Sequence, residues 1–169
     1  MRSILYAAVM CCSAVIGRAQ APDSARAGWA SGMSIGIPGE IGGEPYPVLF
    51  TVAANFTQIR RGPGADISVF TVPRVLPEGA VPLLVRLGVG LPIPLEPGGG
   101  AYFLPSAGVL GAGVMSANGG GATGGWYATG AFIAFGESGN GVRMAYTLYG
   151  LGEPAAWHFE IGFVHRSGR

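Results

Sequence analysis

Apolar and polar residues alternate with a period of two near the end of the chain. The two sets are Trp157, Phe159, Ile161 and Phe163 on one side, and His158, Glu160, Gly162 and Arg166 on the other. Side chains alternate between the two faces of a β-strand, whereas a helix repeats its faces every three to four residues. The pattern therefore predicts a strand with one apolar face and one mixed polar face.

Seven more segments between glycine-rich and proline-rich stretches are predicted as strands. Together the eight candidates are Gly28–Ile37, Pro47–Thr57, Asp66–Arg74, Val81–Leu91, Tyr102–Met115, Gly125–Phe135, Val142–Gly150 and Ala156–Arg166. The alternation is weaker in the third and fifth, where Pro73 and Pro105 are expected at strand ends or bulges. An even number of strands of about ten residues, with no helical segment between them, predicts an all-β fold, an eight-stranded antiparallel up-and-down barrel.

The two faces of these strands differ in the size of their side chains. The first strand carries Gly28, Ala30, Gly32, Ser34 and Gly36 on the polar face, and such small residues suit the narrow interior of eight strands. Long apolar side chains suit contact with lipid, and the chain is 49% hydrophobic and only 11% charged. The barrel is therefore predicted to be transmembrane.

The N-terminus has the features of a secretory signal peptide. Arg2 supplies the positive charge, residues 4–17 are apolar, and Ala19-Gln20-Ala21 resembles a cleavage site. We expect cleavage after Ala19, with Ala21 as the alternative. This gives a signal peptide over residues 1–19, a short segment over 20–27 and a barrel domain over 28–169.

Charge and cysteine content exclude several classes of function for the exported chain. Both cysteines, Cys11 and Cys12, lie within the signal peptide, so the exported chain has no thiol for a disulfide or a metal. Without Arg2 and Arg18 it keeps 8 arginines against 9 acidic residues, a net charge of −1 that does not favour nucleic acid. We expect no cofactor and no metal. No apolar run beyond the signal reaches the roughly 18 residues of a membrane helix.

Aromatic residues lie near the ends of several predicted strands. Membrane barrels carry aromatic girdles at both interfaces with water. If the first strand starts at the inner rim, Trp126 and Trp157 lie at the outer rim. Trp29 and Phe163 are expected to meet at the inner rim, where the first and last strands close the barrel.

The pattern over residues 28–166 resembles the small eight-stranded outer-membrane barrels of the outer membrane protein A class. The last strand, Trp157 to Phe163, is similar to the alternating, aromatic-ended strand that the outer-membrane assembly machinery reads, although this chain continues to Arg169. The family's long external loops are missing, since the longest candidates are Pro38–Tyr46 and Ser116–Gly124. The resemblance implies outer-membrane lipid and the barrel-assembly machinery as partners.

Three charged residues, Arg86, Arg143 and Glu160, fall on the predicted interior face. Buried charges must pair or cost several kcal/mol, so an ion-pair network within the lumen is expected. A gate or narrow conduit is the functional alternative. The interior of eight strands is filled by side chains, which disfavours a wide pore.

Other motifs give weaker indications of chemistry. His165-Arg166-Ser167 resembles the H-x-S element of outer-membrane lipid A deacylases, but no carboxylate is clearly placed to orient the histidine. His158 and His165 are predicted on opposite faces of one strand, so they cannot share a metal. Residues 119–124 satisfy G-x-G-x-x-G but precede a strand instead of a helix, so we interpret them as a loop.

We therefore expect a non-enzymatic outer-membrane barrel that serves the envelope structurally or contacts envelope components. A secreted or periplasmic β-barrel or sandwich that binds a small apolar ligand is the first alternative. An outer-membrane lipid-modifying hydrolase is the second, and it depends on His165 and Ser167 alone.

Overall fold

The computed structural model describes residues 28–40, 50–71, 81–116, 119–150 and 156–167. Within these ranges the regular secondary structure consists of β-strands alone. The strands are β1 (Gly28–Glu40), β2 (Thr51–Ile59), β3 (Gly64–Thr71), β4 (Val81–Gly90), β5 (Ile93–Pro94), β6 (Ala101–Ser116), β7 (Gly119–Phe135), β8 (Asn140–Gly150) and β9 (Ala156–Ser167). The expected signal peptide and the segment over 20–27 lie outside the described residues.

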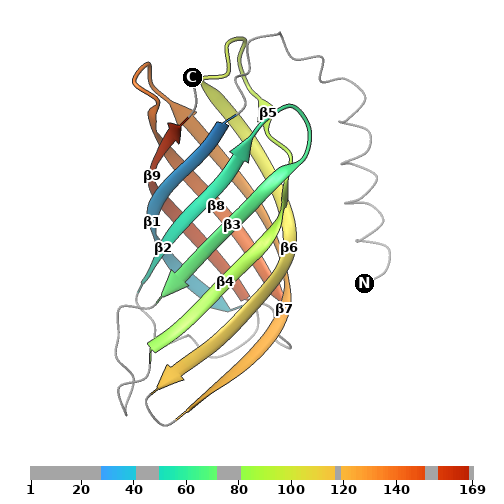
Figure 1. The fold of residues 1–169 in the computed structure, drawn as a ribbon, viewed down its shortest axis with the longest axis vertical. Helices are drawn as coiled ribbons and strands as arrows, with labels where there is room; N and C mark the ends of the chain where they lie inside the picture. Colours follow the sequence, from blue (N-terminus) through green and yellow to red (C-terminus); the bar gives the residue numbers. More distant parts are fainter. Residues whose placement is uncertain (1–27, 41–49, 72–80, 117–118, 151–155, 168–169) are drawn as a thin grey trace.

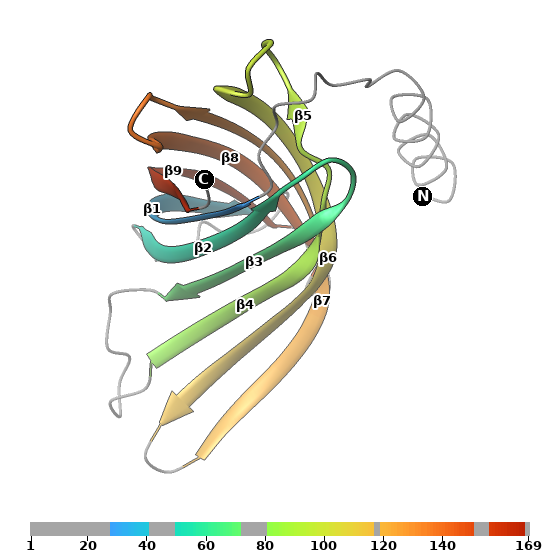
Figure 2. The ribbon, with the colours of Figure 1, turned by 45° about the horizontal axis from the view of Figure 1, so that its top comes forward.

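Eight of the strands form a closed barrel in which each pairs with its neighbours in antiparallel fashion (Figures 1 and 2). β1 pairs with β9 and β4 pairs with β6, and these two pairings complete the circle. The short β5 pairs only with β6, where it extends the sheet beyond the end of β4. The predicted all-β, eight-stranded antiparallel barrel is confirmed.

The first and last strands define the two ends of the barrel. β1 begins and β9 ends at the same end, which we call the termini end; the opposite end is the far end (Figure 1). The termini end also carries the connections over residues 60–63, 91–100 and 136–139. Gly62 and Gly139 lie in two of these turns with φ of 83° and 79°, a conformation that favours glycine.

The two strands that reach farthest at the far end are longer than predicted. The loop interpretation of Gly119–Gly124 is wrong, because β7 begins at Gly119 and pairs there with Ser116 of β6. Glycine has a low strand propensity, but the register of β6 and β7 continues unbroken from Trp126 to Gly119. β1 likewise runs to Glu40, so it includes the first part of the expected loop Pro38–Tyr46.

The start of β2 and the position of Pro105 also differ from the prediction. β2 begins at Thr51, Phe50 lies outside the strand, and residues 47–49 are not among the described residues. Pro105 lies inside β6 without a bulge, at the break between the β4 and β5 ladders. Leu91 N donates to the Pro105 carbonyl at 3.0 Å. The edge of Pro105 that lacks an N–H therefore faces the gap between β4 and β5, where the missing donor interrupts neither pairing.

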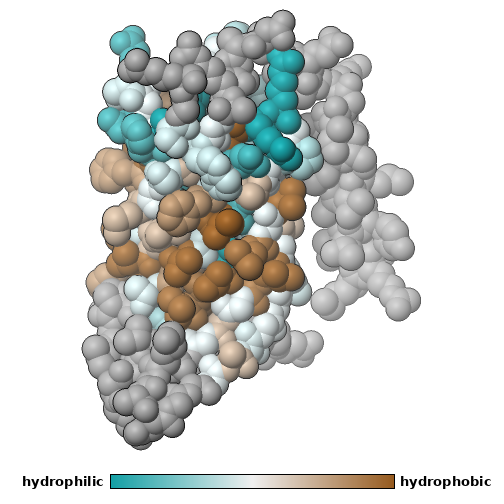
Figure 3. All heavy atoms as spheres, viewed as in Figure 1, coloured by the Kyte–Doolittle hydropathy of each residue, from teal (hydrophilic) through white to brown (hydrophobic). Residues whose placement is uncertain are grey.

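The two faces of the wall have opposite character. Along β9, His158, Glu160 and Val164 are buried, whereas Phe159, Ile161 and Phe163 are exposed, as the alternation predicts. In the weakly patterned β3 it is Asp66, Ser68 and Phe70 that face inward. Figure 3 shows apolar side chains across the middle of the visible wall and polar ones toward the termini end. No helix among the described residues is long and apolar enough to cross a membrane.

Candidate functional site: the polar network inside the barrel

Glu160 is the centre of a buried network inside the barrel. Its Oε1 lies 3.0 Å from Nη1 of Arg86, and its Oε2 lies 3.1 Å from Nη1 of Arg143. Ser34 Oγ also donates to Oε2 at 3.1 Å. Both arginines are 1% exposed and Glu160 is 0% exposed, so one carboxylate contacts two cations largely out of contact with water. The structure thus brings together the three lumen residues singled out in the sequence.

Arg86 has further partners that hold its guanidinium in place. Its Nη1 donates to Thr147 Oγ1 at 2.7 Å, and its Nη2 donates to Ser68 Oγ at 3.0 Å. The guanidinium carbon lies 4.2 Å from the centre of the Phe70 ring, which is a cation–π contact. Hydrogen bonds and an aromatic face therefore replace part of the hydration that this cation loses on burial.

A chain of hydrogen bonds connects Arg86 back to Glu160 along the wall. Ser68 Oγ donates to Asn55 Oδ1 at 2.8 Å, and Asn55 Nδ2 donates to Ser34 Oγ at 2.9 Å. Ser34 then donates to Glu160. The closed ring of contacts takes one residue from each of five adjacent strands, β9, β1, β2, β3 and β4. It joins the two terminal strands to the next three around the barrel.

His158 occupies the lumen on the far-end side of Glu160. Its Nε2 lies 2.6 Å from Thr51 Oγ1, and its Nδ1 lies 3.1 Å from the Tyr149 hydroxyl and 3.4 Å from Glu160 Oε1. The carboxylate of Glu160, the imidazole of His158 and the hydroxyl of Thr51 thus lie in the order of a nucleophilic triad. However, all three side chains are buried, and the imidazole packs edge-on against Phe70 at 5.3 Å between ring centres. A substrate would have to displace this packing to reach Thr51.

Asp66 forms a second polar centre, nearer the termini end. Its two carboxylate oxygens accept from Thr57 Oγ1 at 2.8 Å and from Ser106 Oγ at 2.7 Å. Asp66 and His158 are parts of the lumen network that sequence reasoning missed. Parity along β9 places His158 inward, but the weak alternation of β3 gave little signal for Asp66.

Apolar side chains fill the lumen between this network and the termini end. The cluster consists of Ala30, Ile59, Tyr102, Leu104, Ala131, Ile133, Ala145 and Val164. Arg166 covers it from the termini end, donating to the Gly99 carbonyl at 3.0 Å and lying 4.8 Å from the ring centre of Phe135. The lumen thus has a polar layer, formed by the network, and an apolar layer, formed by this cluster. A smaller apolar cluster of Leu110, Tyr127 and Tyr149 packs against Arg86 and His158 within the polar layer.

The residues considered for lipid hydrolysis lie on the outer face at the termini end. His165 Nδ1 bonds to Asn140 Oδ1 at 2.9 Å, and Ser167 Oγ donates to the Trp29 carbonyl at 3.2 Å. Both side chains are exposed, whereas His158 is buried. Within the described residues, the partner that orients the imidazole of His165 is therefore an amide instead of a carboxylate.

The aromatic girdle candidates occupy both ends of the barrel. Trp126 pairs with Gly150, the last residue of β8, and Trp157 is the second residue of β9, so both are near the far end. Trp29 is near the termini end, where it pairs with Ser167. Phe163 does not meet Trp29: it pairs with Met33, four residues farther into the barrel wall. The register of β1 and β9 extends beyond the aromatic end of β9, which explains this difference.

No family model and no curated protein sequence matches the chain. Solved structures do resemble it. The N-terminal β-barrel domain of Pseudomonas aeruginosa OprF superimposes with a TM-score of 0.60 at 10% identity, over 84% of this chain and all of that domain. Ail, the attachment invasion locus protein of Yersinia pestis, in complex with the heparin analogue sucrose octasulfate, gives 0.56 at 12% identity, over 84% of this chain and 98% of Ail. The chain therefore has the fold of the small eight-stranded outer-membrane barrels.

Proposed function

We propose that this chain is an outer-membrane barrel with a structural or envelope-interaction role, whose filled lumen is not a wide pore. The observation that carries the proposal is the reversal of polarity across the wall. Large apolar side chains such as Met33, Val109 and Phe132 are more than half exposed, while Arg86 and Glu160 are buried. Such polarity stabilises a barrel in lipid, because the outward face meets hydrocarbon and the charged groups are gathered in the lumen, where Glu160 contacts both arginines.

The first alternative, a soluble carrier of a small apolar ligand, needs an apolar cavity inside and polar residues outside. The lumen holds an ion-pair network, and the outer face of the wall carries exposed apolar side chains. This polarity favours the membrane assignment. The expected signal peptide supports export, and the alternating β9 supports recognition by the barrel-assembly machinery. Outer-membrane lipid is the proposed partner of the outer face.

Membrane fractionation of the native host, followed by gel mobility with and without boiling, tests the location and the closed barrel together. We expect the chain in the outer membrane, with a mobility that changes on boiling because a closed barrel resists detergent until heated. Recovery in the soluble fraction with no change in mobility would contradict the proposal.

A pair of variants makes this experiment sharper. Phe132→Arg places a charge on the outward face of β7, which costs up to about 2 to 4 kcal/mol depending on its depth in the bilayer. We expect it to reduce insertion strongly. Glu137→Arg introduces the same arginine in the exposed turn at the termini end, where it reverses a charge outside the apolar wall, so it should insert like the wild type. If Phe132→Arg folds equally well and becomes more soluble, the outward face contacts water.

A further inference from the structure

One edge of the buried guanidinium of Arg143 has no hydrogen-bond partner. Its Nη1 donates to Glu160, but its Nε and Nη2 find no acceptor among the described residues, although the side chain is almost fully buried. In a planar guanidinium the N–H of Nε and one N–H of Nη2 point the same way, and together they form the fork that holds an anion through two parallel hydrogen bonds. A buried donor without an acceptor is costly, so this edge points to a ligand.

Unpaired donors outnumber unpaired acceptors in the polar layer. Among the buried side-chain atoms of the described residues, three donors make no hydrogen bond: Arg86 Nε, Arg143 Nε and Arg143 Nη2. The one acceptor in the same position is Glu160 Oε1, and this oxygen already lies 3.0 Å from Arg86 Nη1 in an ion pair. The layer therefore lacks acceptors, which a ligand that only accepts hydrogen bonds would supply.

The charges inside the barrel also favour an anion. In the part of the chain that the structure describes, the charged side chains that face the interior are those of Arg86, Arg143, Arg166, Asp66 and Glu160. Cations thus outnumber carboxylates by three to two, and protonation of His158 would increase the excess. Both oxygens of Asp66 accept from hydroxyl groups, whereas Arg166 donates to a carbonyl and a hydroxyl. One monovalent anion beside Arg143 would balance these charges.

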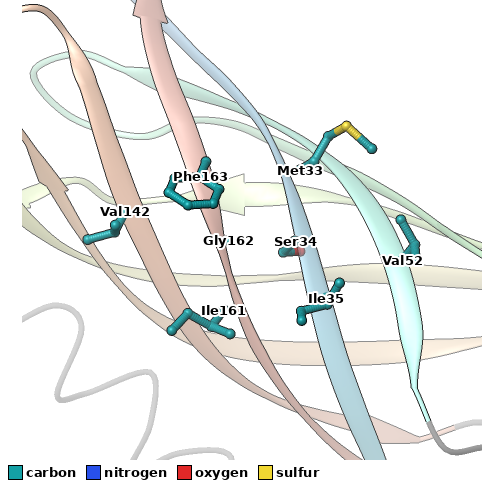
Figure 4. Close-up of a pocket in the computed structure, with 8 residues that line it drawn as sticks. All are labelled: Met33, Ser34, Ile35, Val52, Val142, Ile161, Gly162 and Phe163. Carbon is teal, nitrogen blue, oxygen red and sulfur yellow. The ribbon is translucent and has the colours of Figure 1, made fainter.

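The wall around Arg143 limits the size of the ligand. Gly162 pairs with Arg143 on β9, Ala145 follows it on the same face of β8, and Ala131 pairs with Ala145 on β7. These residues take up little space, but the burial of the guanidinium leaves room only for an ion. Figure 4 shows the outer side of the wall at Gly162 and Ser34, where the surrounding side chains are apolar. The outer face therefore supplies no acceptor through the wall.

A halide fits this edge better than a water molecule does. Water can accept from both N–H groups, but its own two O–H groups then need acceptors. The two alanines have none, and Glu160 Oε2 already accepts from Arg143 and Ser34. A halide ion donates nothing and carries the negative charge that the interior lacks.

We propose that the lumen binds one chloride ion at the Nε–Nη2 edge of Arg143. The ion accepts from both N–H groups, while Nη1 of the same guanidinium donates to Glu160. Chloride is then a structural ligand of the closed barrel, bound by the folded chain and released on unfolding. The site goes beyond the proposed function and does not depend on it, because it needs only the closed barrel.

Urea unfolding of the chain in lipid vesicles tests the site, with chloride replaced stepwise by gluconate. The ionic strength is held constant, so screening of the other charges does not change. A ligand that binds only the folded chain multiplies the ratio of folded to unfolded chain in proportion to its concentration, once this exceeds the dissociation constant. We expect that ratio to rise about ten-fold for each ten-fold increase in chloride in this range. Bromide should replace chloride.

A pair of arginine-to-lysine variants locates the site. Arg143→Lys keeps a cation for Glu160 but removes the planar fork, so we expect its stability to be independent of chloride. Arg166→Lys is the matched control, because Arg166 is an interior arginine near the termini end with a carbonyl and a hydroxyl as partners. It should respond to chloride like the wild type. A boiling-dependent mobility shows that each variant folds.

Anomalous X-ray scattering from wild-type crystals grown in bromide tests the position of the ion without a variant, and it still decides if Arg143→Lys does not fold. We expect a bromide peak beside Nε and Nη2 of Arg143. The site would be overturned by a map without this peak, by a wild type whose stability is independent of chloride, or by an equal chloride response in a folded Arg143→Lys. Failure of the fractionation experiment would instead overturn the proposed membrane location and leave this site standing.

Discussion

Glu160 contacts two buried cations, and each depends on it differently. Arg86 also donates to Ser68 and Thr147 and lies on the Phe70 ring, whereas Arg143 donates to Glu160. Removing one partner of a buried ion pair leaves an uncompensated charge, which costs more than the pair itself contributes. The stability of the lumen therefore depends on Glu160 more than on either arginine.

Replacing Glu160 with glutamine tests this dependence. The substitution keeps the shape of the side chain but removes the carboxylate charge that both guanidinium groups contact, so we expect the free energy of unfolding to fall by about 3 kcal/mol or more. Urea unfolding in lipid vesicles, followed by tryptophan fluorescence, measures the change. Glu137→Gln, in the exposed turn 136–139, is the control and should unfold like the wild type. Similar unfolding of the two variants would show that the network contributes little.

The alternation of side chains along each strand was enough to place Arg86, Arg143 and Glu160 on the interior face, but it could not show which residues they contact. Arg86 and Glu160 lie on strands on different sides of the barrel, and their distance depends on its closure and stagger. The hydrogen bonds from Ser68 to Asn55 and from Asn55 to Ser34 depend on the register of three strands. Serine and asparagine are also common in turns, so their composition gave no signal for a buried role.

At the scale of the strand, Gly162 is required by close packing across the seam between β1 and β9. A Cβ there would collide with the Met33 carbonyl and with Ser34, and the neighbouring backbone would have to move. We expect Gly162→Ala to destabilise the barrel by about 1 to 3 kcal/mol. The fraction of chain that keeps its boiling-dependent mobility in increasing urea measures the effect.

Gly111→Ala in β6 provides the comparison, because a Cβ at Gly111 would meet nothing within 4 Å. It should leave stability near the wild-type value or raise it slightly, since alanine restricts the unfolded chain more than glycine. If both substitutions destabilise equally, loss of glycine flexibility explains the result and close packing at Gly162 does not.

The eight strand positions could be predicted from alternation, whereas several strand ends could not. The ends depend on the partner strand: Gly119–Gly124 are strand because β6 continues to Ser116 beside them. The same cause separates Phe163 from Trp29, since β9 continues past its aromatic residues and pairs along most of β1. Local composition carries no information about how far a partner strand extends.

At the scale of the whole molecule, the two layers of the lumen lie in series along the barrel. Removing the polar layer alone should therefore not open a path for solutes. We expect vesicles with the wild type, or with Arg86→Ala and Glu160→Ala combined, to be as impermeable to arabinose as protein-free vesicles. Adding Tyr102→Ala and Ile133→Ala, which open the apolar layer, should raise the permeability. Swelling of the vesicles in isotonic arabinose measures it, and a permeable wild type would contradict the filled lumen.

The position of Glu160 on β9 has a consequence for biogenesis. β9 carries the anion that both lumenal arginines contact, and it is also the strand that pairs with β1. Until that strand arrives, Arg86 and Arg143 lack this counter-charge, and a barrel sealed early between other strands would enclose them without it. Docking of β9 thus completes the hydrogen-bonded wall and at the same time brings the Glu160 carboxylate to Arg86 and Arg143. Closure without β9 would bury two cations without the carboxylate that contacts both of them.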